Sequence, residues 1–556
     1  MRQAPPLPSC ASRGRGHQVA VAVCAWTAAM AVWAQGAGVV ITPGSVQEGM
    51  PAPALETEPP PSQVVFPEPA PVMDLDPDGG RFVVNAFDIR GATVFSRRRL
   101  KRVMSRFLDL EVNLYDLNRA ADDLTWYYHR RGYPLARAYV PAQTVTNGVV
   151  RIEVVEGRIG QVALQGQRRY DDDFLRARLP ALRSGALVRG EALERDLLRL
   201  NALPGLRGRV ILSPSAQAGA TDALLELRET RVQGDLGVDN FGRAQTGRWR
   251  WRTGLALNSP MGWGDRFRFT GMKTQGGLID HWALDYGLPL GPSGLRLNVS
   301  HSRVAYAVSG QVSALDVGGE VKTTRWQLGA PLISRRTQDS AWSLAYQRSV
   351  SMETALGEPL ARYSLGLFDL GYRHRWTHPD AAQTQLQLQW ASNLRGNPSG
   401  QAQDRVRTRV EVSVNHTAPW TKDWDVQVQA KGVYSPDTLP DNEKFSVGGP
   451  NSVPGFLAGE IRGDSGHVLR LALRRTVTWR ERLLQWRVMA DSGAAVYRLP
   501  GYRDTQESLR SVGLGTTWFA SQSMQISVDW ARAMGSSRRA ADGRKSRVWM
   551  TAHATF

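Results

Sequence analysis

Apolar and polar residues alternate one by one through much of the chain after residue 232. Residues 405–415 read Arg-Val-Arg-Thr-Arg-Val-Glu-Val-Ser-Val-Asn, and residues 385–390, 425–430 and 525–530 follow the same rule. This period of two is typical of β-strands with one apolar and one polar face. The pattern therefore predicts an extensive β-structure from residue 232 to the end, with no convincing helix.

The chain before residue 232 has a mixed pattern. In residues 81–157 one strand is followed by two stretches with apolar residues at helical spacing, 96–107 and 115–131, and then by two strands joined at Asn147-Gly148. Asn-Gly is the strongest short hairpin signal. The same β-α-α-β-β order recurs in residues 158–231, which predicts a duplicated α+β repeat. Two unrelated small α+β domains would give the same pattern.

Strands of soluble β-sandwiches and strands of membrane barrels both show alternating apolar and polar residues. The composition of this region favours the barrel. Fifteen of the 18 Trp follow residue 232, often at strand ends, where outer-membrane barrels carry aromatic girdles. At about 20 residues per strand and connection, residues 232–556 make about 16 strands, within the known range. The sequence has no run of 18 apolar residues, which excludes a bundle of membrane-spanning helices. We expect a 16-stranded antiparallel transmembrane β-barrel.

The first 80 residues carry targeting and linker signals. Residues 1–34 contain arginines without acidic residues, an apolar run and a small-residue end, which predicts a secretory signal peptide. Both cysteines, Cys10 and Cys24, lie inside it; a lipoprotein signal would need small residues before Cys24, where the chain has Val-Ala-Val. Residues 35–80 hold ten prolines, seven acidic residues and no lysine or arginine, which predicts an extended, solvated linker. The mature protein is expected outside the cytoplasm and without disulfides.

The net charge of +18 is concentrated in the rest of the chain. Residues 1–34 hold three arginines and residues 35–80 hold seven acidic residues, so residues 81–556 carry +22. A balance this basic fits nucleic acid, an anionic membrane surface or an acidic protein. Export argues against chromosomal DNA, so we expect no nucleic-acid partner and assign the charge to a polypeptide conduit and to contact with outer-membrane lipid and lipopolysaccharide.

Several motifs, in order and spacing, resemble the TpsB-type transporters of two-partner secretion, the haemolysin secretion/activation family. The resemblance implies two POTRA repeats, 81–157 and 158–231, in the periplasm, and a barrel, 232–556, in the outer membrane. The motifs that carry it are Tyr139-Val-Pro-Ala-Gln143, Asp239-Asn240-Phe241-Gly242, Val453-Pro454-Gly455-Phe456, Gly463-Asp464-Ser465-Gly466 and Met489-Ala-Asp491-Ser-Gly493.

The resemblance also implies a function and partners. The POTRA repeats would recognise a large secreted, TpsA-like partner protein, unfolded in transit, and the barrel would pass it to the cell surface, in some relatives with activation of a haemolysin or adhesin. We expect a monomer, inserted by the barrel-assembly machinery, with no cofactor and no metal. The terminal Phe556 resembles the barrel-assembly signal. The candidate substrate-binding residues in the repeats are Phe87, Ile89, Leu100, Phe107, Leu164 and Leu197.

The expected loop motif departs from the family at its tip. The tip is Val453-Pro454-Gly455-Phe456, with Pro454 where the family has an arginine that pairs with the inner-wall aspartate, here Asp491. A buried, unpaired carboxylate is costly, so we expect Arg462 or Arg470 to supply the cation; a solvated Asp491 in a water-filled lumen is the alternative. Gly493 completes the expected contact between loop and wall. Residues 35–50 form a weak helix, so the family's pore-plugging helix is in doubt.

Two other functional classes are compatible with a barrel. An outer-membrane protein insertase of the same superfamily usually carries three or more POTRA repeats, and two are found here. A barrel protease or phospholipase would lack these repeats and need a catalytic set. Gly463-Asp-Ser-Gly466 resembles a protease nucleophile segment, but no histidine stands in a fitting context, and His374 and His378 lie at a strand end without a third metal ligand. We expect no enzyme activity.

Overall fold

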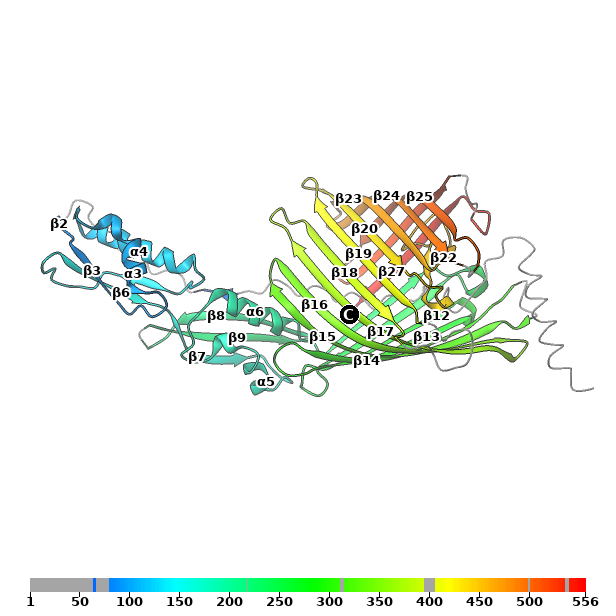
Figure 1. Ribbon diagram of the computed structural model, residues 1–556, viewed down its shortest axis with the longest axis horizontal. Coiled ribbons are helices and arrows are strands. Elements are labelled where there is room, and N and C mark those ends of the chain that lie inside the picture. Colours follow the sequence, from blue (N-terminus) through cyan, green and yellow to red (C-terminus); the bar gives the residue numbers. More distant parts are fainter. Residues whose placement is uncertain are drawn as a thin grey trace, which may run out of the picture.

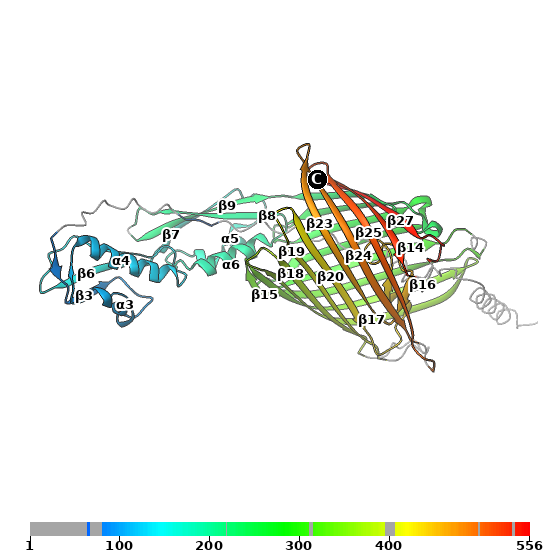
Figure 2. The same cartoon turned by 90° about the horizontal axis from the view of Figure 1, so that it is seen from above.

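The computed structural model is elongated, with two small α+β repeats in a row followed by a large closed barrel (Figure 1). A view turned by 90° shows the same linear arrangement (Figure 2). The structure describes residues 64–66, 80–217, 219–310, 315–394, 406–498, 501–535 and 540–556. The expected signal peptide, most of the expected linker and the weak helix at 35–50 lie outside these residues. None of the described helices is long and apolar enough to cross a membrane.

The first repeat is a three-stranded sheet covered by two helices. Strand β3 (Ala86–Arg90) runs parallel to β6 (Val149–Val155), which pairs antiparallel with β5 (Arg137–Tyr139). The elements on or beside this sheet are α3 (Arg97–Val103), the 3₁₀ turn η1 (Ser105–Phe107), α4 (Leu114–His129) and the small pair β2 (Phe82–Val83) with β4 (Glu111–Val112).

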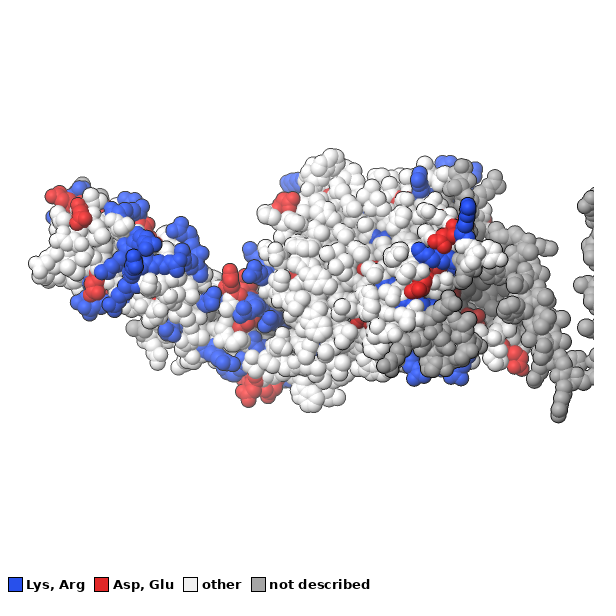
Figure 3. All heavy atoms as spheres, viewed as in Figure 1, with Lys and Arg blue, Asp and Glu red and all other residues white. Residues whose placement is uncertain are grey.

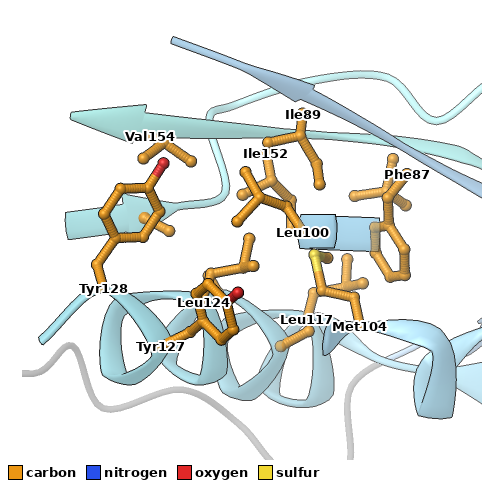
Figure 4. Packing of buried hydrophobic residues seen from close by; sticks show 14 of the residues in the cluster. Phe87, Ile89, Leu100, Met104, Leu117, Leu124, Tyr127, Tyr128, Ile152 and Val154 are labelled. Carbon is orange, nitrogen blue, oxygen red and sulfur yellow. The ribbon is translucent and has the colours of Figure 1, made fainter. Parts of the chain in front are cut away.

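Helix α4 forms where the sequence predicts it because both its start and its buried face are encoded locally. Asn113 Oδ1 accepts the backbone N–H of Asp116 at 3.0 Å, and the Asp116 carboxylate accepts the N–H of Asn113 at 3.3 Å, which makes a capping box. Leu117, Leu124 and Tyr128 face the sheet in one apolar stripe (Figure 4). This stripe and the sheet enclose the core of the repeat.

The second repeat has the same layout with an additional strand from the linker. Its sheet has the order β1-β8-β9-β7, and β1 (Val64–Val65) pairs parallel with β8 opposite Val210 and Ile211. The linker is therefore not solvated throughout, because this β-branched pair adds to the sheet and Val64 packs on the core of the repeat. The remaining elements are β7 (Arg158–Gln165), α5 (Asp172–Arg176), η2 (Pro180–Leu182), α6 (Gly190–Asn201), β8 (Leu206–Pro214) and β9 (Ala220–Glu229).

The barrel has sixteen antiparallel strands, as the sequence predicts, and closes where β27 pairs with β10. Each strand pairs with its neighbours in sequence, except that β20 pairs with β23 across a long connection. The strands are β10 (Val232–Asp239), β11 (Arg250–Asn258), β12 (Arg266–Thr274), β13 (Ile279–Pro289), β14 (Arg296–Ala307), β15 (Gly318–Arg335), β16 (Gln338–Ala355), β17 (Glu358–Thr377), β18 (Gln383–Ser392), β19 (Thr408–Pro419), β20 (Trp424–Tyr434), β23 (Ser465–Trp479), β24 (Arg482–Tyr497), β25 (Thr505–Phe519), β26 (Met524–Met534) and β27 (Ser546–Thr555).

The alternation sorts side chains between the two faces of the barrel wall. Apolar positions such as Leu469, Leu471, Val548 and Met550 are exposed on the outside, and Arg470 between the two leucines points into the lumen. In Figure 3 the outer wall of the barrel is largely free of charge, whereas lysine and arginine gather on the repeats. The apolar belt is the surface that contacts lipid.

Candidate functional site in the barrel lumen

The inner wall is lined by arginines that bind carboxylates on the adjacent strand or on the strand after it. Arg470 Nε lies 3.0 Å from Asp491 Oδ1, and Arg325 Nη1 lies 2.6 Å from Asp369 Oδ2. Each ion pair neutralises charge within a polar wall, so the lumen remains hydrated while its net field is reduced. Further pairs of this kind are Arg375–Asp339, Arg474–Asp425, Arg487–Asp529 and Lys431–Glu411.

The connection between β20 and β23, residues 435–464, folds back into the barrel and is called the lumen loop. Its arms β21 (Phe445–Val447) and β22 (Ile461–Gly463) pair antiparallel, and η6 (Asp441–Glu443) precedes them. Val447, Val453, Phe456 and Ile461 are buried in an apolar cluster that includes Leu509 of β25. The lumen loop is thus a folded element with a small core shared with the wall.

The base of the lumen loop is anchored by the Gly463-Asp464-Ser465-Gly466 motif. Asp464 is fully buried, and its carboxylate accepts the N–H of Leu439 and the N–H of Arg498, both at 2.7 Å. Ser465 Oγ accepts the N–H of Ser435 at 3.0 Å and donates to its carbonyl at 3.1 Å. The Asp-Ser pair of this motif is therefore engaged in holding the loop.

The loop tip, residues 453–456, lies against the last strands of the barrel. Pro454 O accepts the indole N–H of Trp549 at 2.7 Å, and Gly455 O accepts Nε of Arg547 at 3.2 Å. Gly455 also approaches the wall closely, since a Cβ there would lie 2.8 Å from the backbone nitrogen of Ala533. The tip is thus held through its main chain, and only glycine fits at its point of closest approach.

The structure separates the two arginines that the sequence offered to Asp491. Arg470, opposite Asp491 in the β23–β24 register, donates to it, and Ser511 Oγ lies 3.5 Å from the other carboxylate oxygen. Arg462 instead donates to both carboxylate oxygens of Asp441 at 2.7 Å, because the β21–β22 hairpin directs it toward η6. Arg462 is therefore not the partner of Asp491, and Asp491 is buried and paired.

Gly493 makes the contact between loop and wall that its position suggested. A Cβ at Gly493 would lie 2.5 Å from Cγ1 of Val447 in β21, so the glycine leaves room for the lumen loop. Between the loop and the wall a cavity of about 590 Å³ remains, with Arg250, Arg409, Glu411 and Lys431 among its lining residues. Charged and polar residues share the lining with apolar residues such as Phe241, Phe445 and Val468.

The candidate residues in the repeats are mostly inside them. Phe87, Ile89 and Leu100 are buried in the core of the first repeat (Figure 4), and Leu197 is fully buried in the core of the second. These four side chains are engaged in packing, so they are not available to a bound segment. Phe107 and Leu164 are partly buried, and Leu164 lies on β7 at the edge of its sheet. The accessible backbone edges are β3 and the part of β7 beyond Ile159, because Ile159 itself exchanges hydrogen bonds with Gly185 and Ala186.

Three residues that contact the lumen loop were not predicted from the sequence: Trp549, Arg547 and Arg243. The guanidinium of Arg243 binds the carbonyl groups of Ala458 and Gly459. A signal for Trp549 was present. The alternation that places Val548 and Met550 on the lipid face assigns Trp549 to the lumen, where a large indole needs an internal partner.

Two α+β repeats joined to a closed 16-stranded barrel with an inward-folded loop define a barrel protein of the POTRA superfamily. The family model for haemolysin secretion/activation protein ShlB/FhaC/HecB matches residues 223–518, and the model for the ShlB-type POTRA domain matches residues 82–157. The chain belongs to this haemolysin secretion/activation family. It is an outer-membrane β-barrel of the two-partner secretion type, which confirms the resemblance drawn from its motifs.

Individual relatives span most of the chain. The heme/hemopexin transporter protein HuxB of Haemophilus influenzae is 23% identical over 486 residues, 82% of this chain and 84% of the relative. The outer membrane transporter CdiB of Escherichia coli is 25% identical over 425 residues, 72% of this chain and 70% of the relative. The solved structure of CdiB from Escherichia coli matches with a TM-score of 0.70 at 20% identity, covering 99% of this chain and 100% of that chain, so the two share a fold.

Proposed function

We propose that this protein exports one large partner protein, unfolded, from the periplasm through the barrel to the cell surface. The observation that carries the proposal is the lumen wall, where arginines and carboxylates bind each other across strands (Arg470–Asp491, Arg474–Asp425, Arg487–Asp529). Neutralised, hydrated polar groups offer an unfolded polypeptide transient hydrogen bonds without a deep binding site. The relatives' names describe transporters, which agrees with this role.

Recognition is assigned to the sheet edges of the two repeats. An extended segment binds an exposed sheet edge through main-chain hydrogen bonds, which suits an unfolded cargo of variable sequence. The second repeat already accepts such a segment, because β1 of the chain's own linker adds to β8. The opposite edge, β7, carries the partly buried Leu164 and is the position we assign to cargo.

Transit through the barrel is proposed to be driven by folding of the cargo outside the cell. The sequence contains no Walker-type phosphate loop, and the periplasm holds no ATP. Because the folded cargo cannot re-enter a barrel whose lumen holds a loop and a cavity of about 590 Å³, folding outside makes export directional.

Deletion of the gene followed by comparison of secreted and outer-membrane proteins tests the proposal. Loss of one large secreted protein, restored by the full chain, is expected. Broad loss of outer-membrane barrels would instead identify an insertase, and loss of a hydrolytic activity with secretion intact would identify an enzyme. Retained secretion with a toxin that is exported but inactive would assign activation rather than export.

A pair of matched variants locates the recognition edge. Leu164→Lys places a charge on the β7 edge, where charges block strand addition, and we expect it to reduce secretion of the cargo several-fold. Gln165→Lys adds the same charge one residue along the strand, opposite Glu226, and retains Leu164. Wild-type secretion by both variants, at equal barrel abundance in the outer membrane, would remove β7 as the cargo edge.

A further inference from the structure

A group of cations lies on the lipid-facing side of the barrel wall, in β14–β17. Side chains alternate between the two faces along each strand, and Arg325 of β15 and Asp369 of β17 bind each other in the lumen. Alternation from these two residues, carried across the strands by their register, places four cations on the outer face. These residues, called the outer cations, are Arg303, Lys322, Arg348 and Arg362.

The outer cations belong to the extracellular side of the membrane. The turn between β13 and β14 lies against the second repeat, where Arg178 donates to Gly291 O at 2.7 Å, so this end of the wall faces the periplasm. The repeats lie at the same end of the barrel in Figure 1. Strands β14 and β16 run away from this end, and β15 and β17 return toward it. Each outer cation is therefore in the half of its strand that is farthest from the repeats.

An aromatic band separates the outer cations from the middle of the membrane. Trp326 stacks on Tyr346 with ring centroids 5.9 Å apart, and Tyr346 packs on Phe368 at 4.9 Å. Arg348 stands two residues beyond this band on β16, and Lys322 stands four residues beyond it on β15. Aromatic girdles mark the interfaces of membrane barrels, where a charge on the lipid face costs little. The outer cations are thus at the level of the lipid headgroups.

The outer cations carry more positive charge than the protein around them neutralises. Glu320, on the same face, binds both Arg303 and Lys322, the latter with 2.9 Å between Nζ and Oε2. Arg348 and Arg362 are exposed and make no ion pair or hydrogen bond within the part of the chain that the structure describes. Two arginines therefore remain available to an external anion.

Other carboxylates near the outer cations are engaged or remote. Asp280 of β13 binds Lys273 at 3.3 Å, and Asp316 and Glu358 lie at the loop ends of β15 and β17, beyond the cations. Neighbouring strands are about 4.8 Å apart, so the outer cations spread over roughly 14 Å across the four strands. This width exceeds what a single phosphate group covers.

We propose that the outer cations bind lipid A, the diphosphorylated disaccharide headgroup of lipopolysaccharide in the outer leaflet. Arginine forms bidentate, charge-assisted hydrogen bonds with phosphate. Lipid A carries phosphates at both ends of its disaccharide and so reaches cations on separate strands, whereas a phospholipid offers one phosphate. The site gives residues to the lipopolysaccharide contact that the net charge suggested, and it does not depend on the proposed export function.

Native mass spectrometry of the purified full-length protein, titrated in detergent with diphosphoryl lipid A, tests the proposal. The variant Arg348→Gln/Arg362→Gln removes the two unpaired outer cations, and we expect it to weaken lipid A binding at least about 10-fold. Monophosphoryl lipid A is expected to bind the wild type more weakly than the diphosphoryl form. Wild-type affinity in the variant would overturn the proposal. Phosphatidylglycerol that binds as tightly as lipid A, with the same loss in the variant, would show a general phosphate site and also overturn it.

The matched control is Arg475→Gln/Arg482→Gln, which removes two cations from the outer face at the periplasmic end of β23 and β24. It is expected to bind lipid A like the wild type, and a loss equal to that of the test variant would show a general effect of surface charge and overturn the site. Heat-modifiable electrophoretic mobility confirms that each barrel has assembled. If the test variant does not assemble, Arg348→Gln alone gives the same test with a smaller expected loss.

Discussion

At the residue scale, Asp491 and the loop tip, where Pro454 stands at the position expected to hold an arginine, are held by different groups. With no cation at the tip, the buried Asp491 takes its partner from the neighbouring strand, where Arg470 lies opposite in register. The tip in turn is fixed by donors on β27 that bind its carbonyl groups. The wall contact of Asp491 and the contact of the loop tip are thus made by different residues of this chain.

A double-mutant cycle measures the wall contact. Arg470→Met and Asp491→Asn are expected to be coupled by about 1–3 kcal/mol in the free energy of unfolding, because each single change leaves the other group buried without its partner. The barrel's tryptophan fluorescence in a guanidinium titration gives the four free energies. Arg462→Met with Asp491→Asn is the control pair and is expected to be additive within about 0.5 kcal/mol. Coupling of the same size in both cycles would contradict the assignment of Arg470.

Glu156 gives the first repeat a pH-dependent stability. Burial alone would raise its pKa, but hydrogen bonds from the side chain and N–H of Thr93, the N–H of Val94 and the Tyr128 hydroxyl outweigh burial and lower the pKa. A lowered carboxyl pKa stabilises the fold above the unfolded value of about 4.3, and this stability is lost as pH falls through the folded value.

We therefore expect Glu156→Gln to lower the free energy of unfolding of the first repeat by about 1.5–3 kcal/mol at pH 7 and to flatten its pH dependence in the acid range. Circular dichroism at 222 nm during urea titration measures this free energy of unfolding, because the α-helices of the described residues all lie in the repeats. Glu153→Gln, at a position whose carboxylate binds the exposed Tyr139, is the control. An equal loss in both variants would show that Glu156 has no special role.

At the element scale, strand β1 is a contact between the linker and the second repeat that can be broken selectively. Val64→Pro/Val65→Pro removes both N–H groups of β1, and we expect amide exchange at Val210 and Ile211 of β8 to accelerate about 10-fold, since a backbone hydrogen bond contributes about 1 kcal/mol. Val64→Ala/Val65→Ala keeps both N–H groups and is expected to change this exchange less. No acceleration in the proline variant would show that β8 is protected without the linker.

How far the elements follow from sequence depends on whether their contacts are local. The alternation of apolar residues predicted the barrel strands, and their helical spacing predicted α4. Both predictions succeed because the buried and exposed positions of a strand or helix repeat with the period of that element. The first helical segment of the second repeat is divided into α5 and η2, since Pro180 cannot continue a helix. Strand β1 was not predicted, because a two-residue strand between prolines has no period to detect.

The candidate site was less predictable for the same reason. Motif order identified the lumen loop and the inner-wall segment, but the choice between Arg462 and Arg470 needed the β23–β24 register, which no local pattern specifies. The contacts of Trp549 with Pro454 join residues about ninety positions apart in sequence. Residues Phe87 and Leu100 were proposed for cargo because they are apolar, and the same property places them in the core.

At the scale of the whole molecule, the excess positive charge is divided between two environments. In the barrel, arginines are bound to carboxylates across the lumen wall, whereas Arg97, Arg98, Arg99, Lys101 and Arg102 lie exposed on or around α3 of the first repeat. The barrel exterior is largely uncharged (Figure 3). By sequence the repeats, residues 81–231, carry +9 and the barrel, residues 232–556, carries +13, so the excess is shared; the exposed cluster on α3 is the part that a cargo or a membrane surface would meet in the repeats.

The terminal Phe556 takes part in barrel closure, and we propose that it also serves barrel assembly; the two roles give different predictions. Its backbone exchanges two hydrogen bonds of 2.9 Å with Gly234, and its ring, 72% exposed, covers the position where a Cβ of Gly234 would lie 2.2 Å away. Phe556→Ala keeps the backbone bonds, so we expect barrels that do assemble to have nearly wild-type heat stability.

The amount of assembled barrel is expected to fall several-fold in Phe556→Ala, because the terminal aromatic is the feature that we propose the assembly machinery reads. Gly234→Ala is the counterpart: its new methyl group meets only the far end of the exposed ring, which can move aside, so we expect nearly wild-type heat stability and, because the terminal aromatic is retained, a wild-type yield. Quantitative immunoblots of outer membranes, with heat-modifiable mobility as the folding readout, separate the two effects. Wild-type abundance of Phe556→Ala would show that closure at Gly234, and not recognition of the ring, is what the last residue provides.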